Sequence, residues 1–320
     1  MTRWISSAGA GAVLAVALGV SANAAPQELS IMAPAGPGGG WDQTARSMQQ
    51  VLQEAGIVPN VQVTNVPGAG GTIGLAQFVN TAKGDPTQLI VGGYVMVGAI
   101  IANNSPVSLA DVTPIARLTG EYEAIVVPAS SPIQTMEDLI AELKKDPGAV
   151  SWAGGSAGGV DHIAVGLIAK AAGVDPTKIN YVPFSGGGEA LAAILGAQVT
   201  AGVSGYGEFA GQIESGDLRL LGISASGPVE GIDARTLKDA GLDVEVQNWR
   251  MVAAGPELTD EQKADLVATV EAMSETDQWK ETLATKGWLN TFLAGDDFAA
   301  YINSQIEETG QVLKDIGVVQ

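Results

Sequence analysis

Four glycine-rich turns, each between an apolar run with strand character and a helical run, constrain the fold of this chain more than any other feature. They are Pro34–Trp41, Pro67–Thr72, Gly154–Gly159 and Pro183–Gly188. A turn of this kind directs the unpaired N–H groups of the following helix outward, where the helix dipole adds partial positive charge. One such turn is ordinary, but four in two separated pairs predict two walls of one anion-binding cleft.

The runs around these turns alternate between strand and helix, as in a parallel α/β sheet. In the first helix, one face carries apolar residues at three- and four-residue steps from Trp41 to Ala55. The expected strands are Leu29–Ala33, Val61–Val66, Leu89–Val91, Val150–Ala153, Ile179–Phe184, Val199–Val203 and Leu218–Ser224. In open α/β sheets the ligand binds at the carboxyl ends of the strands, and all four glycine turns follow such ends.

The pattern restarts after Val126-Val127-Pro128, which predicts two lobes. We expect residues 25–125 and 247–320 to form lobe 1 and residues 126–246 to form lobe 2. The chain then crosses near Ile125–Val127 and returns near Gln247–Trp249, and these two crossings would form a hinge. Helices over Asp260–Ser274 and Asp296–Ile316 are expected to pack on lobe 1.

The N-terminal segment, residues 1–24, is expected to be an export signal rather than part of the fold. A positive start with Arg3 precedes the apolar stretch Ala8–Val20, and Ala22-Asn23-Ala24 fits signal peptidase cleavage. The chain has no cysteine, which excludes a lipoprotein anchor and disulfides. We therefore expect a soluble periplasmic monomer without a second apolar span.

The charge of the chain is −19, and a surface this acidic argues against binding to nucleic acid or to anionic lipid. Nucleotide motifs are also missing, since no G-x-G-x-x-G register and no lysine followed by serine or threonine occurs. With one histidine and no cysteine, the sequence predicts neither a metal site nor a cofactor.

The segment Gly154–Gly158 matches the G-x-S-x-G elbow of α/β-hydrolases, so an exported serine hydrolase using Ser156 is the alternative function. His162, six residues later on the following helix, would be carried away from the Ser156 hydroxyl. His162 is therefore expected to pack or cap, and Ser156 to bind a ligand carboxylate. Asp42 and Arg46 are expected to form a surface pair.

The chain resembles the solute-binding proteins of tripartite tricarboxylate transporters, also called Bug proteins, over essentially the whole mature length. The resemblance rests on Pro37–Arg46, Asn65–Gly74, Ser151–His162, Tyr181–Ala190 and Asn248–Arg250. It implies a two-lobed α/β fold of the periplasmic-binding-protein type (type II, Venus flytrap) with the ligand cleft between the lobes. It also implies delivery of a small carboxylate to a membrane permease with one large and one small integral subunit.

Carried onto this sequence, the resemblance implicates Gly39, Gly40, Trp41, Gly71 and Thr72 in lobe 1. In lobe 2 it implicates Ser156, Gly158, Gly159, Ser185 and Gly186. Tyr94 and Tyr206 follow strand ends, and their hydroxyls are further candidates, with core packing as the alternative. The motifs are similar to those of the tricarboxylate branch, so a citrate-like ligand leads; a dicarboxylate, or an aromatic carboxylate stacked on Trp41 or Tyr94, is the alternative.

Expression of the full chain in a double-membraned bacterium should yield a mature protein that begins at or near Ala25, because small residues stand before that position. N-terminal sequencing of the periplasmic fraction measures this. Recovery of the uncleaved N-terminus with Arg3 in the membrane fraction would contradict it.

Overall fold

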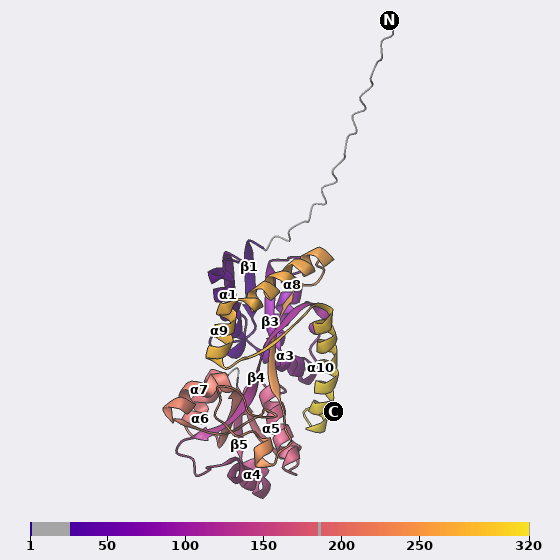
Figure 1. The fold of residues 1–320 in the computed structure, drawn as a ribbon. Coiled ribbons are helices and arrows are strands. Elements are labelled where there is room, and N and C mark those ends of the chain that lie inside the picture. The colour runs from indigo at the N-terminus through magenta and orange to yellow at the C-terminus, as the bar shows by residue number, and fades with distance from the viewer. Residues whose placement is uncertain (2–25, 185–186, 320) are drawn as a thin grey trace.

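The structure is a computed structural model that describes residues 1, 26–184 and 187–319. Figure 1 shows two lobes, one above the other, with long strands running between them. The strands are β1 (Glu28–Ala33), β2 (Asn60–Asn65), β3 (Gln88–Gly93), β4 (Thr113–Pro128), β5 (Ser151–Gly154), β6 (Asn180–Pro183), β7 (Ala201–Gly205), β8 (Leu218–Ile223), β9 (Gln247–Ala254) and β10 (Leu289–Ala294). The helices are α1 (Gly40–Glu54), α2 (Thr72–Thr81), α3 (Tyr94–Ala102), α4 (Met136–Lys145), α5 (Val160–Ala171), α6 (Gly187–Leu195), α7 (Tyr206–Ser215), α8 (Asp260–Glu275), α9 (Asp277–Lys286) and α10 (Gly295–Asp315).

The strands before the glycine turns pair in parallel, as the sequence predicts. In the first lobe β1 lies between β2 and β3, and in the second lobe β5 lies between β6 and β7. The four turns therefore leave the carboxyl ends of β1, β2, β5 and β6. In each lobe, two turns thus emerge at the same edge of a parallel sheet.

Strand β4 belongs to both lobes and was not predicted as a strand; the sequence analysis expected only a crossing of the chain near Ile125–Val127. Its first part, Thr113–Tyr122, pairs antiparallel with β9 and β10, whereas Glu123–Pro128 pairs antiparallel with β7 and β8. Strand β9 in turn pairs with β3, so β4 and β9 connect the parallel strands of the first lobe to those of the second. The sheet is therefore mixed, with parallel strands in each lobe and antiparallel strands between them.

Each lobe has its own hydrophobic core. The first core draws residues from Leu29 to Leu118 and from Trp249 to Ile302. Two further cores hold residues between Ala124 and Val246. Together with the sheet arrangement, this is the two-lobed α/β architecture expected from the sequence. The lobe limits at 125/126 and 246/247 stay a prediction.

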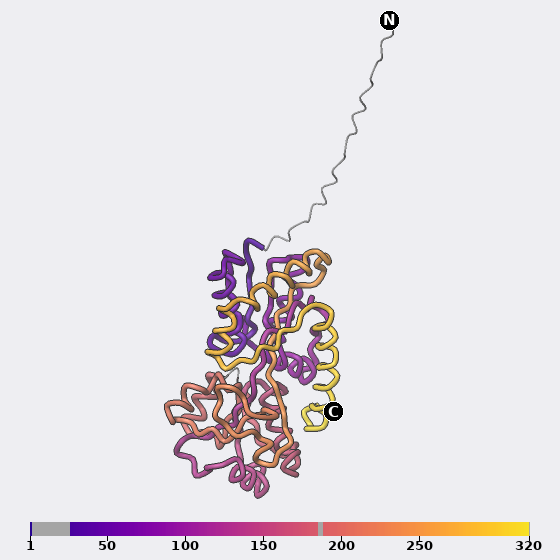
Figure 2. The backbone as a smooth tube through the Cα atoms, viewed as in Figure 1, coloured from indigo at the N-terminus to yellow at the C-terminus, as the bar shows by residue number. Residues whose placement is uncertain are grey.

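The C-terminal helix α10 contacts both lobes, which differs from the expectation that the last helices pack on lobe 1. Its N-terminal part contributes Phe298 and Ile302 to the first core. Its end packs Leu313 and the following Ile316 against Ile163 of α5, and Asp315 lies 2.8 Å from Lys170. Figure 2 shows this end of the tube beside the second lobe.

The lobes also touch through α3 and the third glycine turn. A Cβ built on Gly98 of α3 would overlap the carbonyl oxygen of Gly158. Gly158 itself has φ +76°, and a Cβ there would lie 2.6 Å from the Cβ of Ala102. Glycine at both positions thus permits backbone of one lobe to lie directly on the other.

In the part of the chain that the structure describes, no helix combines the length and the apolar character needed to cross a membrane.

Replacing Gly98 with alanine should push the lobes apart, because the added methyl group meets backbone that has no side chain to rotate away. We expect a loss of about 1–3 kcal/mol in stability of the closed arrangement and a larger radius of gyration in solution scattering. The matched control is Gly211→Ala in α7, where a Cβ meets nothing within 4 Å. That variant should gain roughly 0.5–1 kcal/mol from helix propensity. Equal behaviour of the two variants in melting and scattering would contradict the assigned contact.

Candidate ligand-binding site

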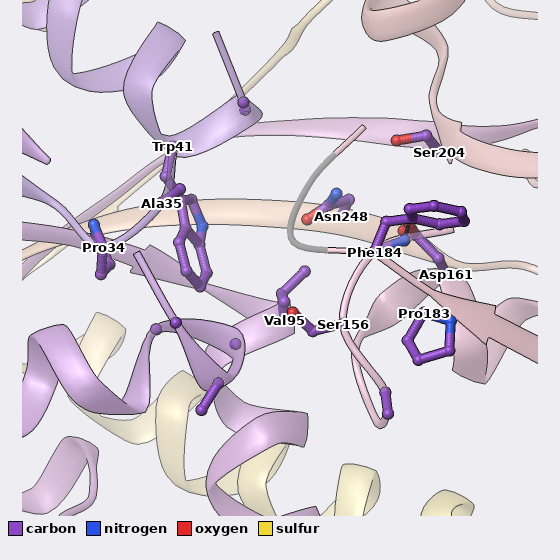
Figure 3. Close-up of a pocket in the computed structure, with 18 of the residues that line it drawn as sticks. Pro34, Ala35, Trp41, Val95, Ser156, Asp161, Pro183, Phe184, Ser204 and Asn248 are labelled. Carbon is purple, nitrogen blue, oxygen red and sulfur yellow. Dashed lines mark hydrogen bonds between the residues drawn. The ribbon is translucent and has the colours of Figure 1, made fainter. Parts of the chain in front are cut away.

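A cavity of about 390 Å³ lies between the two lobes (Figure 3). Residues of the first, second and third glycine turns line it, together with residues at the ends of β6 and β7 and the start of β9. The lining residues are Pro34, Ala35, Gly39, Gly40, Trp41, Gly68, Ala69, Gly70, Gly71, Val95, Asn103, Gly155, Ser156, Ala157, Asp161, Pro183, Phe184, Glu189, Ser204, Glu208, Asn248 and Arg250.

The first glycine turn is held in shape by Asp42. Its carboxylate accepts hydrogen bonds from the Gly38 N–H at 2.8 Å, the Asn65 amide at 2.9 Å and the Arg46 guanidinium at 2.9 Å. These donors keep the pKa of Asp42 below its usual value despite the opposing effect of burial. The predicted pair of Asp42 and Arg46 is confirmed, but its surface position is wrong for Asp42, which is only 2 % exposed and orders the turn from within.

Helix α1 begins directly at the cavity without a side-chain cap. Its N-cap is Gly39, and no side chain bonds to the first-turn N–H groups there. The next residue, Gly40, faces the second lobe so closely that a Cβ on it would lie 2.8 Å from Oε1 of Glu208 and overlap the Arg250 guanidinium. The glycines of this turn thus bring a helix N-terminus against charged side chains.

The second turn shapes the cavity around Trp41. Gly71 has φ +87°, and a Cβ there would lie 2.6 Å from the Trp41 ring, so glycine is required for both reasons. Gly70 faces the third turn, with its Cβ position 3.5 Å from the Cβ of Ser156. Trp41 is 7 % exposed and lines the cavity, so it contributes both to the core and to the site.

The third turn is organised by two side chains of the helix that follows it. The Gly155 N–H donates to Asp161 at 2.5 Å, and the Gly158 N–H donates to Nδ1 of His162 at 3.1 Å. The His162 ring stacks on Tyr181 with 4.2 Å between centroids, and burial lowers its pKa to about 4. His162 is thus a neutral capping residue whose Nδ1 is occupied, as the sequence predicted, which removes support for a Ser156–His162 dyad.

A group of buried charges, which the sequence analysis missed, lies where β4, β7, β9, α5 and α7 meet. The Arg250 guanidinium bonds to Glu121 and lies 3.6 Å from Oε1 of Glu208. Ser204 donates to the other Glu208 oxygen at 3.1 Å. Behind them, the Glu123 carboxyl interacts directly with that of Asp161. One signal was present in the sequence: Glu121 and Glu123 directly precede the apolar run Ala124–Val127.

Burial makes these carboxyls reluctant to ionise. Desolvation, reinforced by neighbouring carboxylates, raises the pKa of Glu208 to about 7. Desolvation also raises the pKa of Asp161 to about 6, and it raises that of Glu123 well above its usual range. Arg250 is the one cation among the described lining residues, so carboxyl groups outnumber cations here. The negative charge of the group therefore changes with protonation close to neutral pH.

The structure divides the predicted site residues into three sets. Gly39, Gly40, Trp41, Gly71 and Ser156 line the cavity. Thr72, Tyr94, Gly158, Gly159 and Tyr206 do not appear in its lining. Ser185 and Gly186 lie outside the described residues.

The second set has visible packing roles. Thr72 donates its hydroxyl to Ala69 O at 2.9 Å, and Tyr94 stacks on Trp249 with 6.3 Å between centroids. Tyr206 packs against the core that contains Phe209. Gly158 and Gly159 lie against α3, as described above for Gly158. Ligand contact by these residues stays a prediction.

Within the described ranges, no group of three or more His, Asp or Glu residues is arranged to hold a metal ion.

Comparison with known proteins places this architecture in a family. The model of the tripartite tricarboxylate transporter family receptor matches residues 43–318. The chain therefore belongs to the tripartite tricarboxylate transporter receptor family. It is similar to protein BugT of Bordetella pertussis, with 27 % identity over 326 residues that cover 99 % of this chain and 98 % of that protein.

Solved structures agree with the fold. MatC from Rhodopseudomonas palustris with bound malate superposes with a TM-score of 0.79 at 24 % identity, covering 89 % of this chain and 98 % of that one. An R. palustris protein with adipate gives a TM-score of 0.80 at 21 % identity, covering 91 % and 97 %. At these identities the likeness establishes a binding-protein fold and does not identify the ligand of this chain.

Replacing Glu208 with glutamine should stabilise the ligand-free protein most at high pH. The pKa of Glu208 is higher in the folded state than in the unfolded state, so the folded protein holds the proton more tightly. This favours folding fully at pH values below the pKa of the unfolded state, and the favourable effect is lost as the pH rises through about 7. Glutamine removes that loss, so the variant should exceed the wild type by on the order of 2 kcal/mol at pH 8 and approach it near pH 5. Urea unfolding at several pH values measures this. The control is Glu214→Gln, an exposed change on the same helix, which should leave the dependence of stability on pH as in the wild type. If Glu208→Gln also kept the wild-type dependence, the assignment would be contradicted.

Proposed function

We propose that this protein is a periplasmic solute-binding receptor that captures a small carboxylate and delivers it to a tripartite tricarboxylate transporter permease. The observation that carries the proposal is that three glycine turns, each leading into a helix, line one cavity between two lobes. The N-cap residues of helices α1, α2 and α5 are Gly39, Gly71 and Gly159, which have no side chain to bond the first-turn N–H groups. Gly39 and Gly71 line the cavity themselves, and the turn before α5 lines it through Gly155–Ala157. Unpaired N–H groups and helix dipoles favour an anion there.

Family membership and the carboxylates bound by relatives support the same ligand class. MatC holds malate, and the second R. palustris protein holds adipate. The cavity is of a size suited to a small molecule, and Trp41 adds an apolar wall. A citrate-like tricarboxylate is the ligand that the sequence motifs favour, and a dicarboxylate is the alternative.

Capture would proceed by closure of the lobes around the ligand. The first and second turns belong to one lobe and the third to the other, so one anion satisfies both sets of donors only when the lobes approach. Strands β4 and β9 provide the connection about which such a hinge would bend. The Gly98–Gly158 contact would fix how far closure proceeds. The permease, with one large and one small integral subunit, would then recognise the closed monomer.

Replacing Ser156 with alanine should weaken carboxylate binding by about 1.5–3 kcal/mol, because a hydrogen bond to a charged group is lost. Isothermal titration with the best carboxylate from a thermal-shift panel measures the change, since a ligand that binds the folded state raises apparent stability. Ser304→Ala on the exposed face of α10 is the matched control. An ester hydrolysis activity that disappears in both Ser156→Ala and His162→Ala would instead establish the hydrolase alternative.

A further inference from the structure

The cavity wall formed by Asp161, Ser204, Glu208, Asn248 and Arg250, here called the acidic wall, differs in character from the glycine turns. The glycine turns offer N–H donors. The acidic wall offers mostly acceptors, since its single cation, Arg250, is already bonded to Glu121 and lies beside Glu208. Figure 3 shows Asp161, Ser204 and Asn248 around the same cavity as Trp41 and Ser156.

Buried acceptors without donors mark the same wall. The Asn248 side chain lines the cavity, the residue is 6 % exposed, and its Oδ1 has no hydrogen-bond partner among the described residues. Oε2 of Glu121, a residue that is 1 % exposed, likewise has no partner there. On the donor side, Arg250 Nη1 is also unpaired. Buried polar atoms are normally satisfied, so the hydrogen bonding of Asn248 and Arg250 on this wall, and of Glu121 behind it, is incomplete without a ligand.

We propose that the ligand presents a positive charge to Glu208 and Asp161 while its carboxylate binds at the glycine turns. This inference rests on the proposed function, because it assigns the second half of the same ligand. Two sources supply such a charge: a protonated nitrogen on a carboxylate-bearing molecule, or a divalent cation chelated by a polycarboxylate. A bare second carboxylate at this wall would instead meet carboxylates of like charge.

The position of Gly40 brings a bound ligand close to the Glu208 carboxyl. Because Gly40 has no side chain, the start of α1 lies directly on the Arg250–Glu208 pair. A small molecule held by the first-turn N–H groups of α1 is therefore next to Glu208. The cation neutralises the wall, and its donors or coordination sites face the acceptors of Asp161, Glu208 and Asn248 that line the cavity.

The pH dependence of binding then has a defined sign. Glu208 faces Arg250 of β9, Glu121 of β4, Asp161 of α5 and Ser204 of β7, and Asp161 faces Glu123 and Tyr181. The pKa values of Glu208 and Asp161, about 7 and about 6, place their ionisation near neutral pH. A positively charged ligand favours the ionised carboxylates, so affinity should rise from roughly pH 6 to 8. Metal-free anions should show the opposite slope.

Matched ligands separate the two sources of charge. Titration calorimetry in EDTA compares succinate with 3-aminopropanoate, glutarate with 4-aminobutyrate, and adipate with 5-aminopentanoate, which differ by one carboxylate exchanged for an ammonium group. Citrate is titrated in EDTA and in excess Mg²⁺. We expect an ammonium compound to bind at least tenfold more tightly than its dicarboxylate partner, or citrate to bind at least tenfold more tightly with Mg²⁺. The first outcome identifies the nitrogen source and the second identifies the chelate.

Variants test whether the acidic wall causes the preference. Glu208→Gln should reduce the preference at least tenfold and flatten the pH dependence, and Asp161→Asn should act in the same direction. Glu214→Gln should retain the wild-type preference. An unchanged circular dichroism spectrum shows that each variant is folded.

Two results overturn the inference. One is tightest binding of a metal-free dicarboxylate or tricarboxylate, which leaves the proposed receptor function intact. The other is a preference that survives Glu208→Gln and Asp161→Asn. Absence of binding by every carboxylate tested would overturn the receptor proposal as well, so the two failures are distinguishable.

Discussion

The structure depends on one strand that both lobes share. Strand β4 pairs with β9 and β10 in its first part and with β7 and β8 in its second, so it belongs to both halves of the molecule. Its residues enter different cores, with Ile115 and Leu118 in the first and Ile125 and Val127 in the second. Because the strand is continuous, the glycine turns of the two lobes are connected through the backbone between these cores.

The same strand carries two buried carboxyl groups. Glu121 and Glu123 lie at the transition between the two lobes and are almost completely buried. Burying a carboxylate without full compensation costs several kcal/mol. One guanidinium, that of Arg250, bonds to Glu121, whereas Glu123 is left against Asp161. A cluster of this kind at the floor of a cavity is more readily explained by binding than by stability, since apolar residues would serve a core better.

Glycine has a second role at this interface, besides its backbone freedom in turns. At Gly40 and Gly98 the φ angle is ordinary, yet a Cβ would collide with the Arg250 guanidinium in one case and with Gly158 in the other. These glycines are required by close approach between segments that are distant in sequence. Gly38, by contrast, has φ +84° and open space around its Cβ position, so the turn itself requires glycine there.

The sequence alone determined the α/β class, the division into two lobes and the glycine turns at the carboxyl ends of strands, because periodicity and turn chemistry are local. It also predicted the capping role of His162 and the positions of Gly39, Gly40, Trp41, Gly71 and Ser156, which line the cavity.

Tertiary structure decided what depends on distant segments meeting. Strand β4 was missed because its first part mixes apolar and charged residues without a clear period. The short helix α3 was missed because the apolar run after Gly93 has no clear period either. Burial of Asp42, contact of α10 with the second lobe and assembly of Glu121, Asp161, Glu208 and Arg250 follow from the packing of elements that are distant in sequence. Arg250 and Glu121 are 129 residues apart, and Asp315 and Lys170 are 145 apart. Their charges and pKa values arise from desolvation at that junction, a property that no local segment of the sequence carries.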